Sequence, residues 1–194
     1  GAIGMAIVMI FMIVIYAIPG LASSIALVIY IILTILLLNG FEITLTLPGI
    51  AGIILSIGMA VDANVIIFAR IREELATGKT VRSSMKIGFQ KAMSAILDGN
   101  ITTLIAALVL WFLGSGTVKG FAQTLALGIA LSMFTALVVT RGIMNAFYAI
   151  GIKDIKFYGI AKPVKKFDYL SKKALFLGVS IALIFVGFVS MGIS

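Results

Sequence analysis

The chain has 194 residues, of which 62% are hydrophobic and 11% are charged, with a formal net charge of +8. A soluble domain is typically about 45–50% apolar and about 25% charged, so this composition excludes a water-soluble enzyme, a secreted disulfide scaffold and a disordered tail. There are no cysteines and no histidines, which excludes thiol nucleophiles, disulfides, imidazole catalysis and the common zinc sites.

Long apolar segments predict an all-α, polytopic bundle of about six membrane-spanning helices, each of roughly 20 residues. Pro19 and Gly20 divide the uncharged run that opens the chain into two spans joined by a tight helical hairpin. The predicted spans cover about residues 2–18, 21–38, 48–68, 96–113, 120–140 and 174–192. The first five form a predicted bundle over 1–150, and a basic linker over 151–173 precedes the sixth.

The distribution of Lys and Arg predicts the orientation of the bundle. All of them except Lys119 lie either between the third and fourth spans or between the fifth and sixth. The positive-inside rule therefore places both segments, 70–95 and 141–173, in the cytoplasm. Orientation and contact with anionic lipid headgroups account for the basic charge, and no nucleic-acid partner is expected.

The first basic segment contains a predicted amphipathic helix that lies at the membrane interface before the fourth span. Thr80 is its predicted N-cap. Its apolar residues recur at helical spacing and are Val81, Met85, Phe89, Ala92 and Ile96. Arg82, Lys86 and Gln90 face elsewhere. The alternative is that this helix docks a partner protein.

Asp62 is the clearest functional candidate because it interrupts the third span. It lies eight residues before Arg70, which is roughly 12 Å inside the cytoplasmic boundary. A charged residue at such depth costs ~2.5–3.5 kcal/mol on insertion scales. The short side chain must therefore face protein or a water-filled cleft. We predict a proton relay there, with a structural interhelical hydrogen bond as the alternative.

Asp98 is the second predicted relay carboxylate, near the start of the fourth span. Its alternative role is structural, as a carboxylate beside a helix N-terminus and near Lys91. The alternative in which Asp62 and Asp98 pair as the two carboxylates of an intramembrane aspartyl protease is not favoured. No catalytic constellation, metal site or cofactor is expected.

Other polar residues are predicted to support the relay. They are Asn64, Asn100, Thr102, Thr103 and Arg141. Asn64 does not share a helix face with Asp62 and is equally suited to a hydrogen bond with a neighbouring helix. Arg141 is expected to snorkel at the inner boundary, or else to bind a specific partner such as Asp98 or a lipid phosphate.

Small residues in the third and fifth spans predict close helix packing, because they allow backbones to approach each other. In the fifth span they recur at intervals of four from Gly120 to Thr140. The predicted packing residues are Gly52, Ser56, Gly58, Gly120, Thr124, Gly128 and Ser132.

Several motifs in order along the chain resemble those of the SecD family of protein-export membrane proteins. Residues 47–74, LPGIAGIILSIGMAVDANVIIFARIREE, resemble the family's signature segment, except that Ala69 stands where many relatives have Glu. Gly88 and Phe89, followed by residues 96–107, ILDGNITTLIAA, resemble the next motif. Residues 114–122, GSGTVKGFA, and 132–141, SMFTALVVTR, resemble the motifs after that. The matches cover about residues 1–141, equivalent to the second through sixth SecD spans. Residues 167–173, FDYLSKK, are similar to the opening of SecF, as in a SecDF fusion.

The resemblance implies an RND-superfamily bundle that uses the proton motive force to assist the SecYEG translocon in the bacterial cytoplasmic membrane. It implies a SecF half or subunit, YajC and YidC as further partners, and Asp62 as the family's key intramembrane carboxylate. The coupling ion is expected to be H⁺, with Na⁺ as the alternative. The extracytoplasmic domain that acts on the emerging preprotein is expected outside these residues, in a longer protein. An RND-like transporter of lipid or small solute and a structural scaffold are the alternative functions.

The predicted orientation is testable by single-cysteine labelling, since the chain has no cysteine of its own. Lys79→Cys and Lys162→Cys should resist a membrane-impermeant thiol reagent added outside intact cells, whereas Thr44→Cys should react. Labelling of all three after membrane disruption controls for accessibility. External labelling at Lys79→Cys would overturn the orientation.

Overall fold

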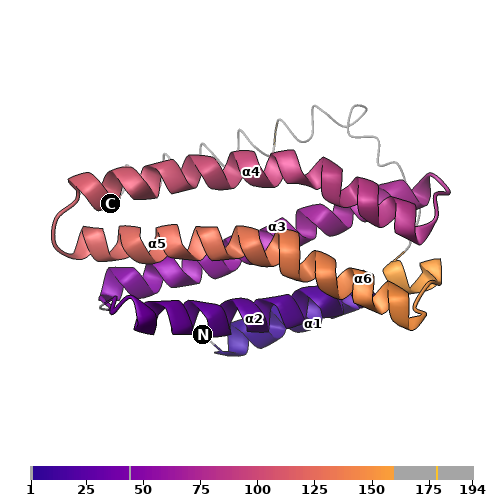
Figure 1. Ribbon diagram of the computed structural model, residues 1–194, viewed down its shortest axis with the longest axis horizontal. Coiled ribbons are helices and arrows are strands. Elements are labelled where there is room, and N and C mark those ends of the chain that lie inside the picture. The colour runs from indigo at the N-terminus through magenta and orange to yellow at the C-terminus, as the bar shows by residue number, and fades with distance from the viewer. Residues whose placement is uncertain (1, 44, 160–177, 179–194) are drawn as a thin grey trace. The chain divides into compact units, whose positions relative to one another are not determined.

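Helices make up the fold in the residues that the computed structural model describes, which are 2–43, 45–159 and 178 (Figure 1). The elements are α1 (Ala2–Tyr16), α2 (Ile18–Gly40), α3 (Leu47–Ala76), α4 (Val81–Leu113), α5 (Thr117–Phe134), the π-helical segment η1 (Thr135–Thr140), α6 (Arg141–Ile150) and the 3-10 helix η2 (Ile155–Tyr158). The predicted sixth span, apart from residue 178, and the linker from residue 160 onward lie outside the described residues.

Four helical segments are long and apolar enough to cross a membrane, which confirms the predicted all-α membrane bundle. They are residues 18–40, 47–76, 81–113 and 117–150, the last comprising α5, η1 and α6 in one continuous helix. The 15 residues of α1 extend only about 22 Å, less than the ~30 Å hydrocarbon core of a bilayer.

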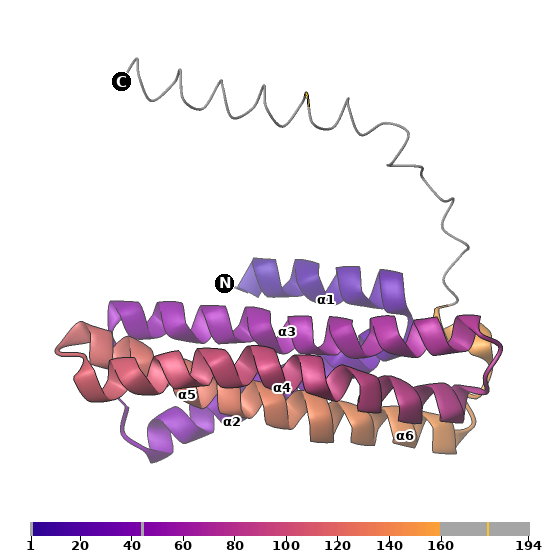
Figure 2. The same ribbon diagram turned by 90° about the horizontal axis from the view of Figure 1, so that it is seen from above.

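The central feature of the bundle is the pair formed by α3 and α5, which make the most extensive contacts between any two elements. Helix α4 packs along both of them, and α2 packs on the opposite side of α5 (Figure 1). Figure 2 shows α1 beside α3. The described basic segments, around residues 70–86 and 141–158, lie together at one end of the bundle, which we call the basic end (Figure 1).

The turn between α1 and α2 is a tight helical hairpin at the predicted place. Ala17 joins the two helices with a φ of 53°, in the left-handed region. Gly20 then lies directly against α1, because a Cβ atom there would come 2.0 Å from the carbonyl oxygen of Met12. Only glycine allows this approach, so the Pro19-Gly20 pair fixes how closely the hairpin closes.

Small side chains bring α3 and α5 into contact over several turns. A Cβ atom on Gly52 would lie 2.5 Å from the Thr124 hydroxyl, and one on Gly128 would lie 2.2 Å from the Ser56 hydroxyl. The Thr124 hydroxyl also donates to the Gly49 carbonyl at 3.0 Å. Backbone and short polar side chains therefore meet directly, as in membrane helix pairs held by van der Waals packing and hydrogen bonds.

The predicted interfacial helix is the first part of one continuous 33-residue helix, α4. Thr80 is its N-cap as predicted, accepting a hydrogen bond from the Ser83 amide at 3.4 Å. The predicted apolar stripe is buried against protein: Val81, Met85, Phe89, Ala92 and Ile96 are all 3% exposed or less. A Cβ atom on Gly88 would come 2.9 Å from the Ile71 Cα. This stripe therefore packs on the end of α3 instead of lying on a lipid surface.

Glu74 joins α3 to α4 at the basic end, beyond the apolar segment that ends at Phe68. Its side chain is 5% exposed and accepts hydrogen bonds from the ammonium groups of Lys79 and Lys91, the latter at 2.5 Å. These bonds, the one from Lys79 first, hold the pKa of Glu74 below its ordinary value. The turn between the helices, residues 77–80, is therefore pinned by one carboxylate shared between two cations.

Residues 151–159, expected to begin a linker, fold back onto the basic end. Tyr158 is fully buried, and its hydroxyl donates to the Ile152 carbonyl at 2.8 Å. The ring belongs to the same core cluster as Phe68, Ile71 and Met144. This stretch is therefore part of the bundle, because an aromatic ring that fills a gap between helices is stabilised by burial.

The α3–α5 contact predicts a position-specific response to added side-chain volume. Gly128→Leu should lower the free energy of unfolding by about 1–3 kcal/mol through overpacking, since the new side chain enters space held by Ser56. Gly99→Leu is the matched control, because in the described ranges no atom from beyond its own helical turn lies within 4 Å of a Cβ atom there. Thermal unfolding in detergent measures both, and equal melting temperatures for the two variants would contradict this packing.

Candidate functional site

Asp62 lies on a face of α3 that is turned away from α5 and α4. Its side chain is exposed and borders a cavity of about 540 Å³ between α3 and the α1–α2 hairpin. The other residues that line this cavity are Gly4, Met5, Val8, Leu27, Ile54, Ile57, Gly58 and Val61. Among the described residues that line the cavity, only Asp62 has a polar side chain, so one carboxyl group borders an otherwise apolar hollow.

The carboxylate of Asp62 is not engaged by the charged groups of the described chain. The ion pairs there are Arg70 with Glu73, and Glu74 with Lys79 and Lys91. A carboxylate at this depth needs an internal partner or water, because exposure to hydrocarbon is costly. The described part of the chain supplies no charged partner for it, so its surroundings within a membrane must include water or another polypeptide.

Gly58 differs from its predicted role in helix packing. It is exposed, and among the described residues no atom from beyond its own helical turn lies within 4 Å of the position that its Cβ would occupy. It lies one helical turn before Asp62 and lines the same cavity. The absence of a side chain at Gly58 thus leaves space beside the carboxylate, whereas Gly52 and Ser56 on the adjoining face are buried against α5.

Asn64 lies on the opposite, inward face of α3 and is 3% exposed. Its side-chain oxygen accepts a hydrogen bond from the Thr140 hydroxyl at 2.9 Å, and its side-chain nitrogen donates to the Ala60 carbonyl at 3.2 Å. The Thr140 hydroxyl also lies 3.1 Å from the Thr135 carbonyl. Asn64 therefore makes the interhelical hydrogen bond that was one of its two predicted roles.

Thr140, the hydrogen-bond partner of Asn64, lies in the π-helical segment η1. No pattern in the sequence predicted this segment. A π-helical segment turns less per residue than an α-helix, because its hydrogen bonds span five residues. Residues spaced four apart do not stay on one face of an α-helix, because the helix completes a turn every 3.6 residues. The wider π-helical turn brings the later members of the series back toward the same face. Ser132, Thr135, Ala136 and Thr140 are accordingly all buried.

Asp98 differs from both structural expectations for it. It is exposed on α4, well inside a helix that begins at Val81, so it does not lie beside a helix N-terminus. Lys91, its expected neighbour, pairs with Glu74 instead. The fourth span was predicted to begin near Asp98. In the structure it continues the predicted interfacial helix, so the N-terminus of the combined helix lies at Val81.

The polar cluster after Asp98 bonds within its own helix. Thr102 and Thr103 donate to the carbonyl groups of Asp98 and Gly99, at 2.9 and 3.0 Å. Asn100 is 7% exposed, and its side-chain nitrogen donates to the Ile96 carbonyl at 2.7 Å. Its side-chain oxygen is buried and has no hydrogen-bond partner in the described part of the chain. A threonine hydroxyl that donates to the carbonyl group four residues earlier in its own helix has no hydrogen left to donate to a neighbouring helix.

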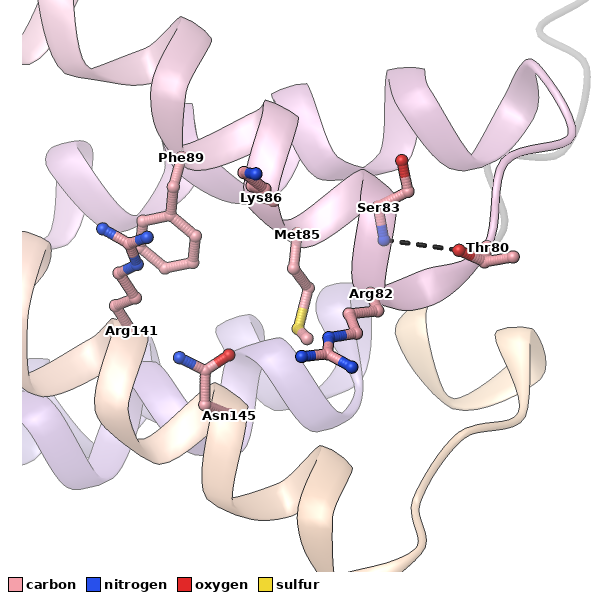
Figure 3. A pocket seen from close by; sticks show the side chains of 8 residues that line it. All are labelled: Thr80, Arg82, Ser83, Met85, Lys86, Phe89, Arg141 and Asn145. Atoms are coloured by element: carbon pink, nitrogen blue, oxygen red, sulfur yellow. Dashed lines mark hydrogen bonds between the residues drawn. The ribbon is translucent and has the colours of Figure 1, made fainter.

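Arg141 begins α6 at the basic end, directly after the predicted fifth span. Its side chain is exposed, and its guanidinium carbon lies 5.9 Å from the centre of the Phe89 ring, a cation–π contact (Figure 3). Among the described residues it forms no ion pair with Asp98. No group of three or more acidic residues that could hold a metal ion occurs in the described ranges either.

Comparisons with known proteins converge on one family. The model of the protein export membrane protein SecD/SecF C-terminal family matches residues 2–149. The chain is 56% identical over 145 residues to the protein translocase subunit SecD of Acidaminococcus fermentans, covering 75% of this chain and 35% of that protein. It is 49% identical over 162 residues to SecD of Dictyoglomus turgidum, covering 82% and 41%.

A solved structure is also similar. The crystal structure of SecDF, described as a translocon-associated membrane protein, from Thermus thermophilus matches with a TM-score of 0.82 and 34% identity, covering 95% of this chain and 26% of that one. The chain thus spans 35% and 41% of the length of the two curated relatives and about a quarter of the solved structure.

The hydrogen bond from Thr140 to Asn64 predicts a measurable loss of stability when it is removed. Thr140→Val should lower the free energy of unfolding by about 0.6–1.7 kcal/mol, the range of interhelical hydrogen bonds in membrane proteins, because the Asn64 oxygen loses its donor. Thr102→Val is the control, since the Thr102 hydroxyl bonds only within α4. An equal effect of both substitutions on thermal unfolding would show that the interhelical bond contributes nothing.

Proposed function

Because the chain belongs to the SecD/SecF family of protein export membrane proteins, we propose that it is the membrane part of an accessory subunit of the Sec translocase. In this proposal it uses the proton motive force to promote preprotein translocation across the bacterial cytoplasmic membrane. It does so without catalysing a covalent reaction. The SecYEG translocon and a SecF half or subunit are its proposed partners, and YajC and YidC are proposed as further ones.

The observation that carries this proposal is the carboxyl group of Asp62 on an apolar cavity. A residue that couples to a proton gradient must alternate between a charged and a neutral form, and each form must be accommodated within the membrane. Asp62 lies within an apolar span, yet it is exposed on the described bundle and unpaired with its cations. This combination supports a titrating role more than a structural one, because a structural hydrogen-bonding residue is satisfied inside the fold, as Asn64 is.

The exposure of Asp62 also supports the proposed SecF partner. An uncovered carboxylate facing hydrocarbon would be unfavourable, so a second helical half placed over the cavity would complete the site. The proton path would then run between two halves, with α3 contributing Asp62. Asn64 would hold α3 in register with η1, and so would keep the carboxyl group aimed at the partner.

The relatives favour export over the alternative of an RND-like transporter. They are protein translocase subunits, and the similar solved structure is described as translocon-associated. Transporter folds of repeated membrane halves also place charged groups near the midplane. The bundle alone is therefore compatible with either activity, and the choice rests on the relatives.

Replacing the carboxyl group of Asp62 tests the proposal. Asp62→Asn retains the size of the side chain but cannot ionise, so the protein should accumulate normally and lose the stimulation that a proton gradient gives to translocation. Asp62→Glu should retain part of it, because the group still titrates. The measurement is preprotein translocation into inverted membrane vesicles that contain the longer protein expected to include this chain, with its SecF partner and the translocon, with and without a gradient.

Three parallel arms make this experiment specific. Glu73→Gln removes an exposed carboxylate that pairs with Arg70 at the surface, and it should leave the gradient response intact. Asp98→Asn tests the second predicted relay carboxylate. Replacing the proton gradient by a sodium gradient tests the coupling ion. An Asp62→Asn protein that still responds fully to the gradient would refute the relay and leave a packing role.

A further inference from the structure

A second cavity, of about 450 Å³, lies at the basic end between the start of α4 and α6 (Figure 3). Three cationic side chains line it: Arg82 and Lys86 from α4, and Arg141 from α6. In Figure 3 the Arg82 and Arg141 side chains come from different helices, with the Asn145 amide between them. The proposed translocation function uses none of these groups.

The positive charge of this cavity is uncompensated within the described part of the chain. Its lining contains no acidic residue, and the ion pairs of the described residues use Arg70, Lys79 and Lys91 instead. The pocket also includes the amino-terminal end of α4, where the helix dipole and free amide groups favour an anion. This cavity is therefore lined by three cations, one amide and a helix N-terminus. Such a set of donors suits an oxyanion that accepts several hydrogen bonds.

The level of the cavity in the fold indicates where that oxyanion would come from. Arg141 directly follows the apolar segment 120–140, and its guanidinium lies over Phe89. Lys86 is three residues from Phe89 on the same helix, less than one turn of about 5.4 Å. The cavity therefore begins where the predicted span ends, at the depth of lipid headgroups. Phe89 and Met85 add an apolar wall to it.

We infer that this cavity binds the phosphate headgroup of an anionic phospholipid from the adjacent leaflet. The Arg141 guanidinium would bind the phosphate through paired hydrogen bonds, and Lys86 and Arg82 would add charge. The level of the cavity, where the predicted span ends, would place the acyl chains of the lipid along the apolar segment, and a free phosphate has no such chains. This inference does not depend on the proposed role of Asp62, which lines a different cavity. A binding measurement tests it without any translocation assay.

The test compares lipid binding by two variants of equal charge. The site variant carries Arg82→Gln, Lys86→Gln and Arg141→Gln. The control carries Arg70→Gln, Lys153→Gln and Lys156→Gln, which change exposed residues of the same basic end that do not line the cavity. Native mass spectrometry of the full chain in detergent, titrated with phosphatidylglycerol or phosphatidylcholine, measures the affinity of each.

The site variant should bind phosphatidylglycerol roughly tenfold more weakly or worse, since each cation near a membrane surface contributes about 1 kcal/mol. The control should bind like the original chain, and phosphatidylcholine should bind weakly to all. Equal losses in the two triple variants would overturn the inference in favour of a diffuse surface charge. Displacement of the lipid by millimolar inorganic phosphate would also overturn it, by showing a site for soluble phosphate.

A single substitution keeps the test valid if the site variant fails to fold. Lys86 is exposed, so Lys86→Gln should leave thermal unfolding unchanged while weakening phosphatidylglycerol binding severalfold. Lys153→Gln is its control. Unchanged binding by a folded Lys86→Gln protein would remove the central cation from the proposed site and refute it.

Discussion

The close contact between α3 and α5 determines which face of α3 is buried within the membrane-spanning part of the bundle. Gly52 and Ser56 on α3 meet Thr124 and Gly128 on α5 with almost no side chain between the backbones. Inside a bilayer there is no hydrophobic force to drive helices together, so shape fit and hydrogen bonds must do so. Once this face of α3 is buried, the opposite face is necessarily directed outward.

Asp62 and Asn64 show the consequence of that geometry. They are two residues apart and therefore lie on different faces of one helix. The α3–α5 contact buries Asn64, which then finds the Thr140 hydroxyl across the interface. The same contact leaves Asp62 exposed beside its apolar cavity. One face of α3 thus carries a buried, hydrogen-bonded amide, and the opposite face carries an exposed carboxyl group that makes no ion pair in the described part of the chain.

The basic end is organised by a different physical principle, since water and headgroups screen charge there. One buried carboxylate, Glu74, takes two lysines and holds the turn between α3 and α4. Tyr158 closes the core from the carboxy-terminal side. Three cations that form no ion pair among the described residues, Arg82, Lys86 and Arg141, line the cavity between α4 and α6. The cations that hold the turn and the cations that line the cavity are therefore different residues, although they alternate along the chain.

Local signals in the sequence determined the helical membrane class, the hairpin at Pro19-Gly20, the N-cap at Thr80 and the apolar stripe from Val81 to Ile96, because each depends on residues within a turn or two. The motif around Asp62 likewise identified the family. Only the tertiary structure decided which side chains meet. It put Asn64 against Thr140, left Gly58 beside the Asp62 cavity, and made one helix of two predicted ones, which removed Asp98 from a helix N-terminus. The π-helical turn η1 could not be predicted for the same reason. Small residues at intervals of four indicate that one face of a helix is packed, but the exact turn of that helix depends on the neighbouring helix.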